Sequence, residues 1–353
     1  MGGALSGGIQ RSLVSIGNIG ERLPGILVTC SLLVGEFIRW RECRWESTAE
    51  DRAGTARVRP VGAAAAGTPA SRTPRRTTDS GTPRPRICPS RRSHTGTGWT
   101  AGLLSRQVGA ENVTSVELDP DLARRARHRL HAAGLRSTVI AGDGTLGHPE
   151  GAPFDRVHFT AAVQRLPSAI IDQTAPGGVI LVPYGTPFCN GALLRLTVAE
   201  DGQSASGPFV EDVSFMWVRD QRPDSGEFDI GDIRRGASGI DPAAVAEQTH
   251  AAFAIGLRMP DLFRQDVWAG YDRFGTGRAE VWDGTSYAHC RFADWAGPHA
   301  VSQSGPRSLW DEVTAAHGWW VGHGKPDLTR LGMTVTVSGE HHPWLDEPGN
   351  VLH

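Results

Sequence analysis

The stretch VGAENVTSVELDP (residues 108–120) predicts a turn, a buried strand and an acidic strand end, and residues 121–133 follow it as a helix. Upstream, the glycine-rich segment Thr95-Gly96-Thr97-Gly98-Trp99 leads into a helix expected at residues 101–107. A glycine-rich turn at a helix start, with an acid ending the next strand, is how an open α/β sheet binds a nucleoside ligand. Glycines let the backbone approach the ligand, and the acid accepts hydrogen bonds from ribose hydroxyls. Glu117 follows Gly98 by 19 residues, close to the ~20 of that unit.

Residues 94–219 alternate between apolar strands and helices, which predicts an α/β domain with a Rossmann-like, doubly wound sheet. The expected strands are residues 114–118, 137–141, 156–160, 179–183 and 192–198. Besides residues 101–107 and 121–133, a helix is expected at residues 167–173.

Two further regions flank this domain. Residues 1–93 form a segment rich in arginine and proline that keeps no period of 2 or 3.6, and we expect it to be largely disordered, above all from about residue 48 to residue 92. Residues 220–353 begin with a polar linker, and eight of the 11 tryptophans lie beyond residue 200, which indicates a small α+β module with an aromatic core. Helical spacing places four apolar side chains on one face, Leu309, Val313, Ala316 and Trp320. Alternation at Met333, Val335 and Val337 predicts a half-buried strand.

Charge and cysteine usage limit the possible partners. Residues 1–93 carry 15 arginines and 7 acidic residues, so the formal charge of this segment is +8. The net charge of the whole chain is −2. Its other irregularities disfavour nucleic-acid binding, and the apolar run at residues 23–34 is shorter than the ~20 residues of a membrane span. The five cysteines lack a CxxC pair, which fits a reducing cytoplasm and no zinc site. The histidines His317, His323, His341 and His342 are expected at the surface, with no metal bound.

Five blocks in order resemble the protein-L-isoaspartate O-methyltransferases, a family of class I S-adenosylmethionine-dependent methyltransferases. These blocks are TGTGWTAGLL (95–104), ENVTSVELDP (111–120), GDGTLGHPEGAPFDRV (142–157), TAAVQRLP (160–167) and QTAPGGVILVPYG (173–185). The C-terminal module resembles the extra domain of actinobacterial relatives, some of which look like partners of ATP-grasp ligases in ribosomal-peptide maturation.

The resemblance implies S-adenosyl-L-methionine as cofactor and a role for each matching residue. Gly96, Thr97 and Gly98 would cradle its methionyl part, and Glu117 with Leu118 would hold the ribose. Gly142, Asp143 and Gly144 would lie at the adenine, with Asp143 accepting from the exocyclic amine. Thr160, Ala161 and Ala162 would line the floor where cofactor and substrate meet. Taken singly, each acid also has a purely structural explanation: Glu117 could cap a strand, and Asp143 could start a turn.

The family pattern is broken just before the glycine-rich loop, where an apolar strand should end in an acid. Here Arg92 stands at the acid's place and His94 at that of the first glycine, and Pro89 disfavours a strand. We therefore expect the first strand of the sheet to be missing or replaced. Our hypothesis is that residues 1–93 are translated in the wrong frame; a natural basic tail is the alternative, and the other two frames of the encoding DNA distinguish them.

The resemblance implies a carboxyl O-methyltransferase of the protein-repair type, acting on L-isoaspartyl or aspartyl residues of a protein or peptide. A carboxylate is already ionised at neutral pH, so no catalytic base is expected and the rate gain comes from proximity. His158 is accordingly interpreted as a packed or edge residue and not as a base. Two alternatives stay open: a methyltransferase of an ATP-grasp peptide-maturation system, and an inactive remnant that acts as a binding module.

Overall fold

The computed structural model describes residues 87–89, 98–223, 231–267 and 277–352. The chain divides into two units, Met1–Arg72 and Thr73–His353, and every described residue belongs to the second. Apart from Ile87–Pro89, the segment expected to be disordered lies outside the described residues, as do Gly96 and Thr97.

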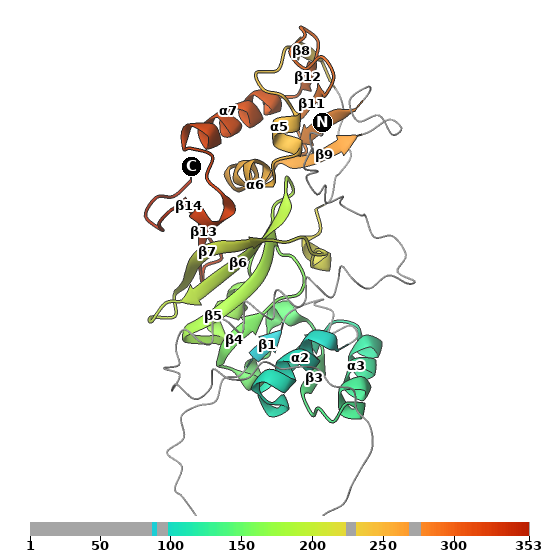
Figure 1. Cartoon of the computed structure of the whole chain (residues 1–353), viewed down its shortest axis with the longest axis vertical. Coiled ribbons are helices and arrows are strands. Elements are labelled where there is room, and N and C mark those ends of the chain that lie inside the picture. Colours follow the sequence, from blue (N-terminus) through green and yellow to red (C-terminus); the bar gives the residue numbers. More distant parts are fainter. Residues whose placement is uncertain (1–86, 90–97, 224–230, 268–276, 353) are drawn as a thin grey trace, which may run out of the picture. The chain divides into compact units, whose positions relative to one another are not determined.

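The parallel strands and their helices form an α/β layer, as the alternating pattern predicts (Figure 1). In chain order the strands are β1 (Ile87–Pro89), β2 (Thr114–Glu117), β3 (Thr138–Ala141), β4 (Phe154–His158) and β5 (Thr174–Gly185). The helices of this part are α2 (Trp99–Val108), α3 (Pro120–Ala132) and α4 (Ser168–Asp172). β2 pairs in parallel with β3, and β1 pairs in parallel with β4, which pairs with β5. Since β1 also contacts β2, the order in space is 3-2-1-4-5, which is that of a Rossmann-like fold.

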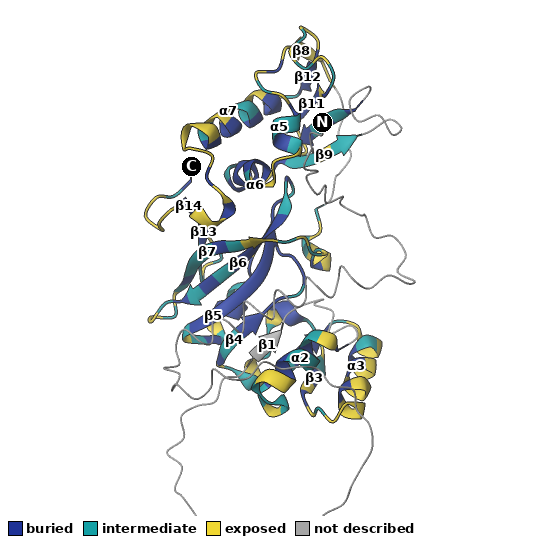
Figure 2. Ribbon diagram, in the orientation of Figure 1, coloured by how far each residue is buried: buried dark blue, intermediate teal, exposed yellow. Residues whose placement is uncertain are grey.

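The sequence of α3 shows why a helix begins directly after β2. Asp119 accepts backbone hydrogen bonds from Asp121 and Leu122, and Pro120 occupies the first helical position, where its missing N–H costs nothing. The helix is buried along one face at Ala123, Ala126 and Leu130, whereas the opposite face is exposed (Figure 2). The helix therefore covers the sheet with a single stripe of apolar side chains.

The first strand is present but short. Ile87–Pro89 pairs with Arg156, Val157 and His158 of β4, although the sequence led us to expect this strand to be missing or replaced. Pro89 is compatible with this pairing because it is the last residue of the strand, where the loss of one backbone donor is tolerated. Three residues thus occupy the position that the family pattern gives to a longer apolar strand.

The sheet continues beyond β5 with antiparallel strands, two of which come from the far end of the chain. These strands are β6 (Asn190–Val198), β7 (Ser204–Asp212), β13 (Leu331–Thr336) and β14 (His341–Leu345). β13 pairs with β7 from Gly332 opposite Pro208 to Thr336 opposite Ser204. Met333 and Val335 are buried and alternate with half-buried threonines, as predicted. The stretch after residue 220 therefore completes the sheet of the preceding domain.

A second, antiparallel sheet of five strands has its own core. Its order is β8-β12-β11-β10-β9, from β8 (Arg234–Gly236), β12 (Val301–Ser304), β11 (Tyr287–Arg291), β10 (Arg278–Trp282) and β9 (Phe263–Val267). The helices of this part are α5 (Ala243–Ala246), α6 (Thr249–Arg258) and α7 (Leu309–Gly322). The predicted apolar face of α7 is confirmed, since Leu309, Val313, Ala316 and Trp320 are all buried.

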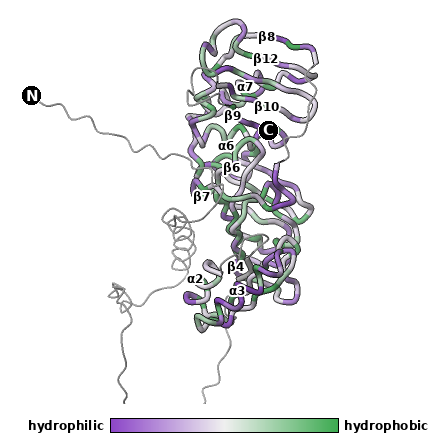
Figure 3. Tube along the Cα trace, turned by 90° about the vertical axis from the view of Figure 1, so that its right-hand side faces the viewer, coloured by the Kyte–Doolittle hydropathy of each residue, from purple (hydrophilic) through white to green (hydrophobic). Residues whose placement is uncertain are grey.

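Helix α6 links the cores of the two sheets. It contacts both β6 and α7, and seven of its ten residues are buried, in keeping with the largely hydrophobic trace around α6 in Figure 3. A helix that is apolar on nearly all sides must be enclosed on nearly all sides. The helices that the structure describes include none long and apolar enough to cross a membrane.

The attachment of β13 can be tested at Gly332, where a Cβ atom would overlap the indole ring of Trp344 in β14. Gly332→Ala is expected to lower the free energy of unfolding by about 1–3 kcal/mol, because the ring or the strand must shift. The matched control is Gly236→Ala in β8, where a Cβ would meet no atom within 4 Å. Urea denaturation measures both, and equal stability of the two variants would contradict this packing.

Candidate active site

The carboxyl ends of the parallel strands bring most of the predicted site residues to one edge of the sheet. Gly98 precedes α2, Glu117 ends β2, Gly142 follows β3 and Thr160 follows β4. In open α/β sheets ligands bind at this edge. The structure joins two of these positions directly, because the Gly142 amide donates to the Glu117 carbonyl at 2.8 Å.

Gly98 takes a backbone conformation that suits glycine. Its φ is +83°, and its α-carbon faces α3, where an added Cβ would lie 3.5 Å from the Ala126 carbonyl oxygen and from Leu130. A larger residue here would be strained by the positive φ. The positive φ, and not a lack of space beside α3, is therefore what requires glycine at this position.

Glu117 is a carboxyl group enclosed within the fold. It is 1% exposed, and its Oε1 accepts a hydrogen bond from the Asp119 amide at 3.1 Å. The neighbouring Leu118 is half-buried. A buried carboxyl group at the end of a strand requires hydrogen-bond donors, which ribose hydroxyls are able to supply.

Asp143 shapes the turn after β3. Its Oδ1 accepts from the Thr145 amide at 2.9 Å and from the Thr145 hydroxyl at 3.1 Å, so it caps the short helix Gly144–Leu146. This is the local role that the sequence left open for Asp143. Gly142 and Asp143 are half-buried, and Gly144 is buried.

The segment after β4, residues 159–167, is here called the acceptor loop. It stays attached to β5, because Val163 donates to the Pro183 carbonyl and accepts from the Gly185 amide. On its other side Ala162 donates to Met216 and accepts from Val218. Ala161 and Ala162 are buried, and Thr160 is half-buried.

Gln221 holds the backbone of the acceptor loop through its side chain. Its Oε1 accepts from the amides of Gln164 and Arg165, both at 2.8 Å, and its Nε2 donates to the Arg165 carbonyl at 2.9 Å. In turn, the Nε2 of Gln164 donates a hydrogen bond to the Gln221 carbonyl. Sequence analysis missed Gln221, which lies in the expected polar linker.

His341 satisfies the next amide of the loop. Its Nε2 accepts from the Leu166 N–H at 3.0 Å, and its Nδ1 pairs with the Gly339 carbonyl at 3.1 Å. This network assigns the neutral tautomer with the proton on Nδ1. Burial, together with nearby Arg165 and His342, lowers the pKa of His341 and so maintains the neutral ring. The surface position expected for His341 and His317 is wrong: His341 is half-buried beside the ring of Tyr184, and His317 is buried beside Trp320.

His158 is confirmed as a packed residue. It is 2% exposed, and burial lowers its pKa to about 4, so the ring is neutral at physiological pH. Among the residues that the structure describes, no three His, Cys, Asp or Glu side chains cluster in a way that would hold a metal ion.

The strand order and the glycines and acids at this edge define a Rossmann-like α/β domain, and comparison with known proteins shows which family it is similar to. Residues 94–222 match the family model of protein-L-isoaspartate(D-aspartate) O-methyltransferase. This part of the chain is similar to that family.

Individual relatives agree over the same part of the chain. A protein-L-isoaspartate O-methyltransferase of Gloeobacter violaceus is 47% identical over 109 residues, which are 31% of this chain and 52% of that protein. The enzyme of the same name from Ignicoccus hospitalis is 43% identical over 91 residues, 25% of this chain and 43% of its own. The chain thus spans about half the length of the curated relatives it matches. A solved structure titled protein-L-isoaspartate O-methyltransferase is 18% identical, covers 75% of this chain and 76% of its own, and superposes with a TM-score of 0.42.

The role of His341 gives a prediction for amide exchange. His341→Ala removes the acceptor of the Leu166 N–H, and exchange of that amide is expected to become roughly two- to tenfold faster, as the loss of one hydrogen bond implies. His342→Ala is the matched control, because His342 is the next residue along β14 and makes no such bond among the described residues. Hydrogen-exchange mass spectrometry measures the exchange rate of the acceptor loop. An unchanged rate in His341→Ala would show that the hydrogen bond from Leu166 to His341 does not hold the loop in place.

Proposed function

We propose that this chain transfers a methyl group from S-adenosyl-L-methionine to the carboxylate of an L-isoaspartyl or aspartyl residue in a protein or peptide. The observation that carries the proposal is the family match over residues 94–222, which includes the whole sheet edge described above. The alternatives raised by the sequence, peptide maturation beside an ATP-grasp ligase and an inactive binding module, gain no support from the matches.

The residues of the sheet edge fit the cofactor. Glu117 offers a buried carboxyl group to ribose hydroxyls, and the positive φ of Gly98 lets the chain turn into the start of α2. Gly142, Asp143 and Gly144 would lie at the adenine, while Gly96 and Thr97, outside the described residues, would approach the methionyl part. When bound, the sulfonium of the cofactor supplies an activated methyl group.

The remaining chemistry is positioning. The acceptor carboxylate is ionised at neutral pH, and neutral, buried His158 is not required as a base. The acceptor loop, through Thr160, Ala161 and Ala162, would hold the carboxylate oxygen in line with the methyl carbon and exclude water. The methyl ester of an isoaspartyl residue then closes without further help: the next backbone nitrogen attacks the ester carbonyl, methanol leaves and a succinimide forms.

The test is methyl transfer by the purified 353-residue chain to a peptide containing one isoaspartyl residue, with the aspartyl isomer as its matched control. Labelled methyl groups are expected to appear on the isoaspartyl peptide and to leave as methanol in mild base. Transfer to neither peptide would refute the proposal, and transfer to the aspartyl peptide alone would assign the other acceptor.

The ribose assignment is tested separately at Glu117. Glu117→Ala is expected to weaken the binding of S-adenosylhomocysteine by about 1–3 kcal/mol, the range for a lost buried hydrogen-bond partner. Calorimetric titration measures this, with Glu200→Ala as control because Glu200 is exposed after β6, away from this edge. Equal affinity of the two variants would show that Glu117 does not hold the cofactor.

A further inference from the structure

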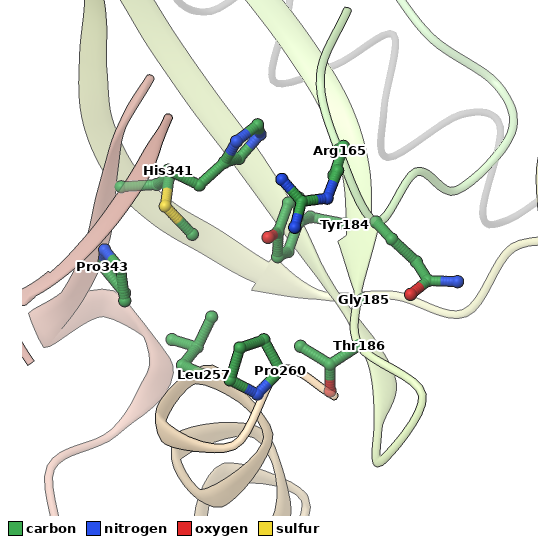
Figure 4. A pocket seen from close by; sticks show the side chains of 10 residues that line it. Arg165, Tyr184, Gly185, Thr186, Leu257, Pro260, His341 and Pro343 are labelled. Carbon is green, nitrogen blue, oxygen red and sulfur yellow. The ribbon is translucent and has the colours of Figure 1, made fainter. Parts of the chain in front are cut away.

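A cavity lies where the acceptor loop meets the C-terminal stretch of the chain (Figure 4). The loop and the end of β5 supply one wall, and α6, β13 and β14 supply the other. It encloses about 150 Å³, well below the ~300–1,000 Å³ of pockets that hold whole small molecules. Its size therefore suits one side chain of a larger ligand.

The wall from the C-terminal stretch is largely apolar. It consists of Leu257, Pro260, Met333 and Pro343, together with the ring of His341. Leu257 and Pro260 lie across the cavity from Arg165 and Tyr184 in Figure 4. Such a wall fits the methylene groups of a side chain.

The opposite wall carries the only charge among the lining residues. Arg165 is exposed at the loop and has no acidic partner among the described residues, while Gln164, Tyr184 and Thr186 add neutral polar groups. Arg165 lies close enough to Tyr184 to act on its hydroxyl electrostatically, and burial keeps that hydroxyl protonated by raising its pKa. His341 is neutral, since both ring nitrogens are engaged by the backbone. The cavity thus presents a guanidinium and a hydroxyl donor, and its lining has no anion to neutralise them.

A guanidinium of this kind selects carboxylates, because its planar donors match the two oxygens. The cavity is also near the expected site of methyl transfer. Arg165 is three residues beyond Ala162, at most ~11 Å along an extended chain. A peptide whose acceptor residue lies on Thr160–Ala162 would bring its neighbouring side chains to the cavity.

We infer that this cavity binds an acidic side chain of the peptide substrate, close in sequence to the residue that is methylated. The inference rests on the proposed function, which supplies the peptide. Arg165 pairs with the carboxylate, and the apolar wall packs against the stem of the side chain. The chain would then prefer damaged sites that lie next to glutamate.

The test measures the binding of isoaspartyl peptides to the full chain by calorimetry, with S-adenosylhomocysteine present. Each peptide carries one Glu at position −2, −1, +1 or +2 from the isoaspartyl residue, and each has a partner with Gln there. At one position or more, the Glu peptide is expected to bind about tenfold tighter, as a charge-assisted hydrogen bond implies. Arg165→Gln is expected to abolish the difference. Arg129→Gln, an exposed arginine of α3, is expected to keep it.

The outcomes separate this inference from the proposed function. If no Glu peptide is preferred, or if the preference survives Arg165→Gln, the cavity does not bind an acidic side chain. If the preference depends on Arg165 but neither isoaspartyl nor aspartyl peptides accept a methyl group from S-adenosyl-L-methionine, the inference stands and the proposed function is wrong. Failure of every peptide to bind overturns both.

Discussion

The acceptor loop depends on three consecutive backbone amides that have no partner in a strand or helix. Those of Gln164 and Arg165 donate to the side chain of Gln221, and that of Leu166 donates to His341. Buried or half-buried amides are costly when unpaired. Two side chains, one of them 175 positions away, therefore fix the part of the loop that follows the expected methyl-transfer floor.

This constraint explains why the last strands of the chain belong to the first sheet. β13 pairs with β7, and β14 pairs with β13, which places His341 beside the loop. The same arrangement closes the cavity, since Met333 and Pro343 line it together with Arg165. The residues after 220 thus do more than form a separate module: they complete the site of the domain that precedes them.

Local patterns in the sequence predicted the α/β order, the strand that ends at Glu117 and the buried face of α7. These features could be predicted because periodicity and helix caps depend on residues that are close together in the sequence. They missed β7 and the roles of Gln221 and His341, because a polar side chain that bonds a distant backbone leaves no local signal. The first strand was hard to predict for the opposite reason: Pro89 argues against a strand, yet three residues suffice to pair with β4. The cofactor and substrate roles of all the site residues, including Gly96 and Thr97 outside the described residues, stay predictions.

The central claim is that the sheet edge from Gly98 to Thr160 is formed well enough, despite the short first strand, to bind S-adenosyl-L-methionine. Calorimetric titration of the purified 353-residue chain with S-adenosylhomocysteine tests it most directly. One molecule bound per chain, with micromolar affinity and a cooperative thermal transition, is the expected result. A folded chain that gives no heat of binding would contradict the account, because it would show that this edge, though built, holds no cofactor.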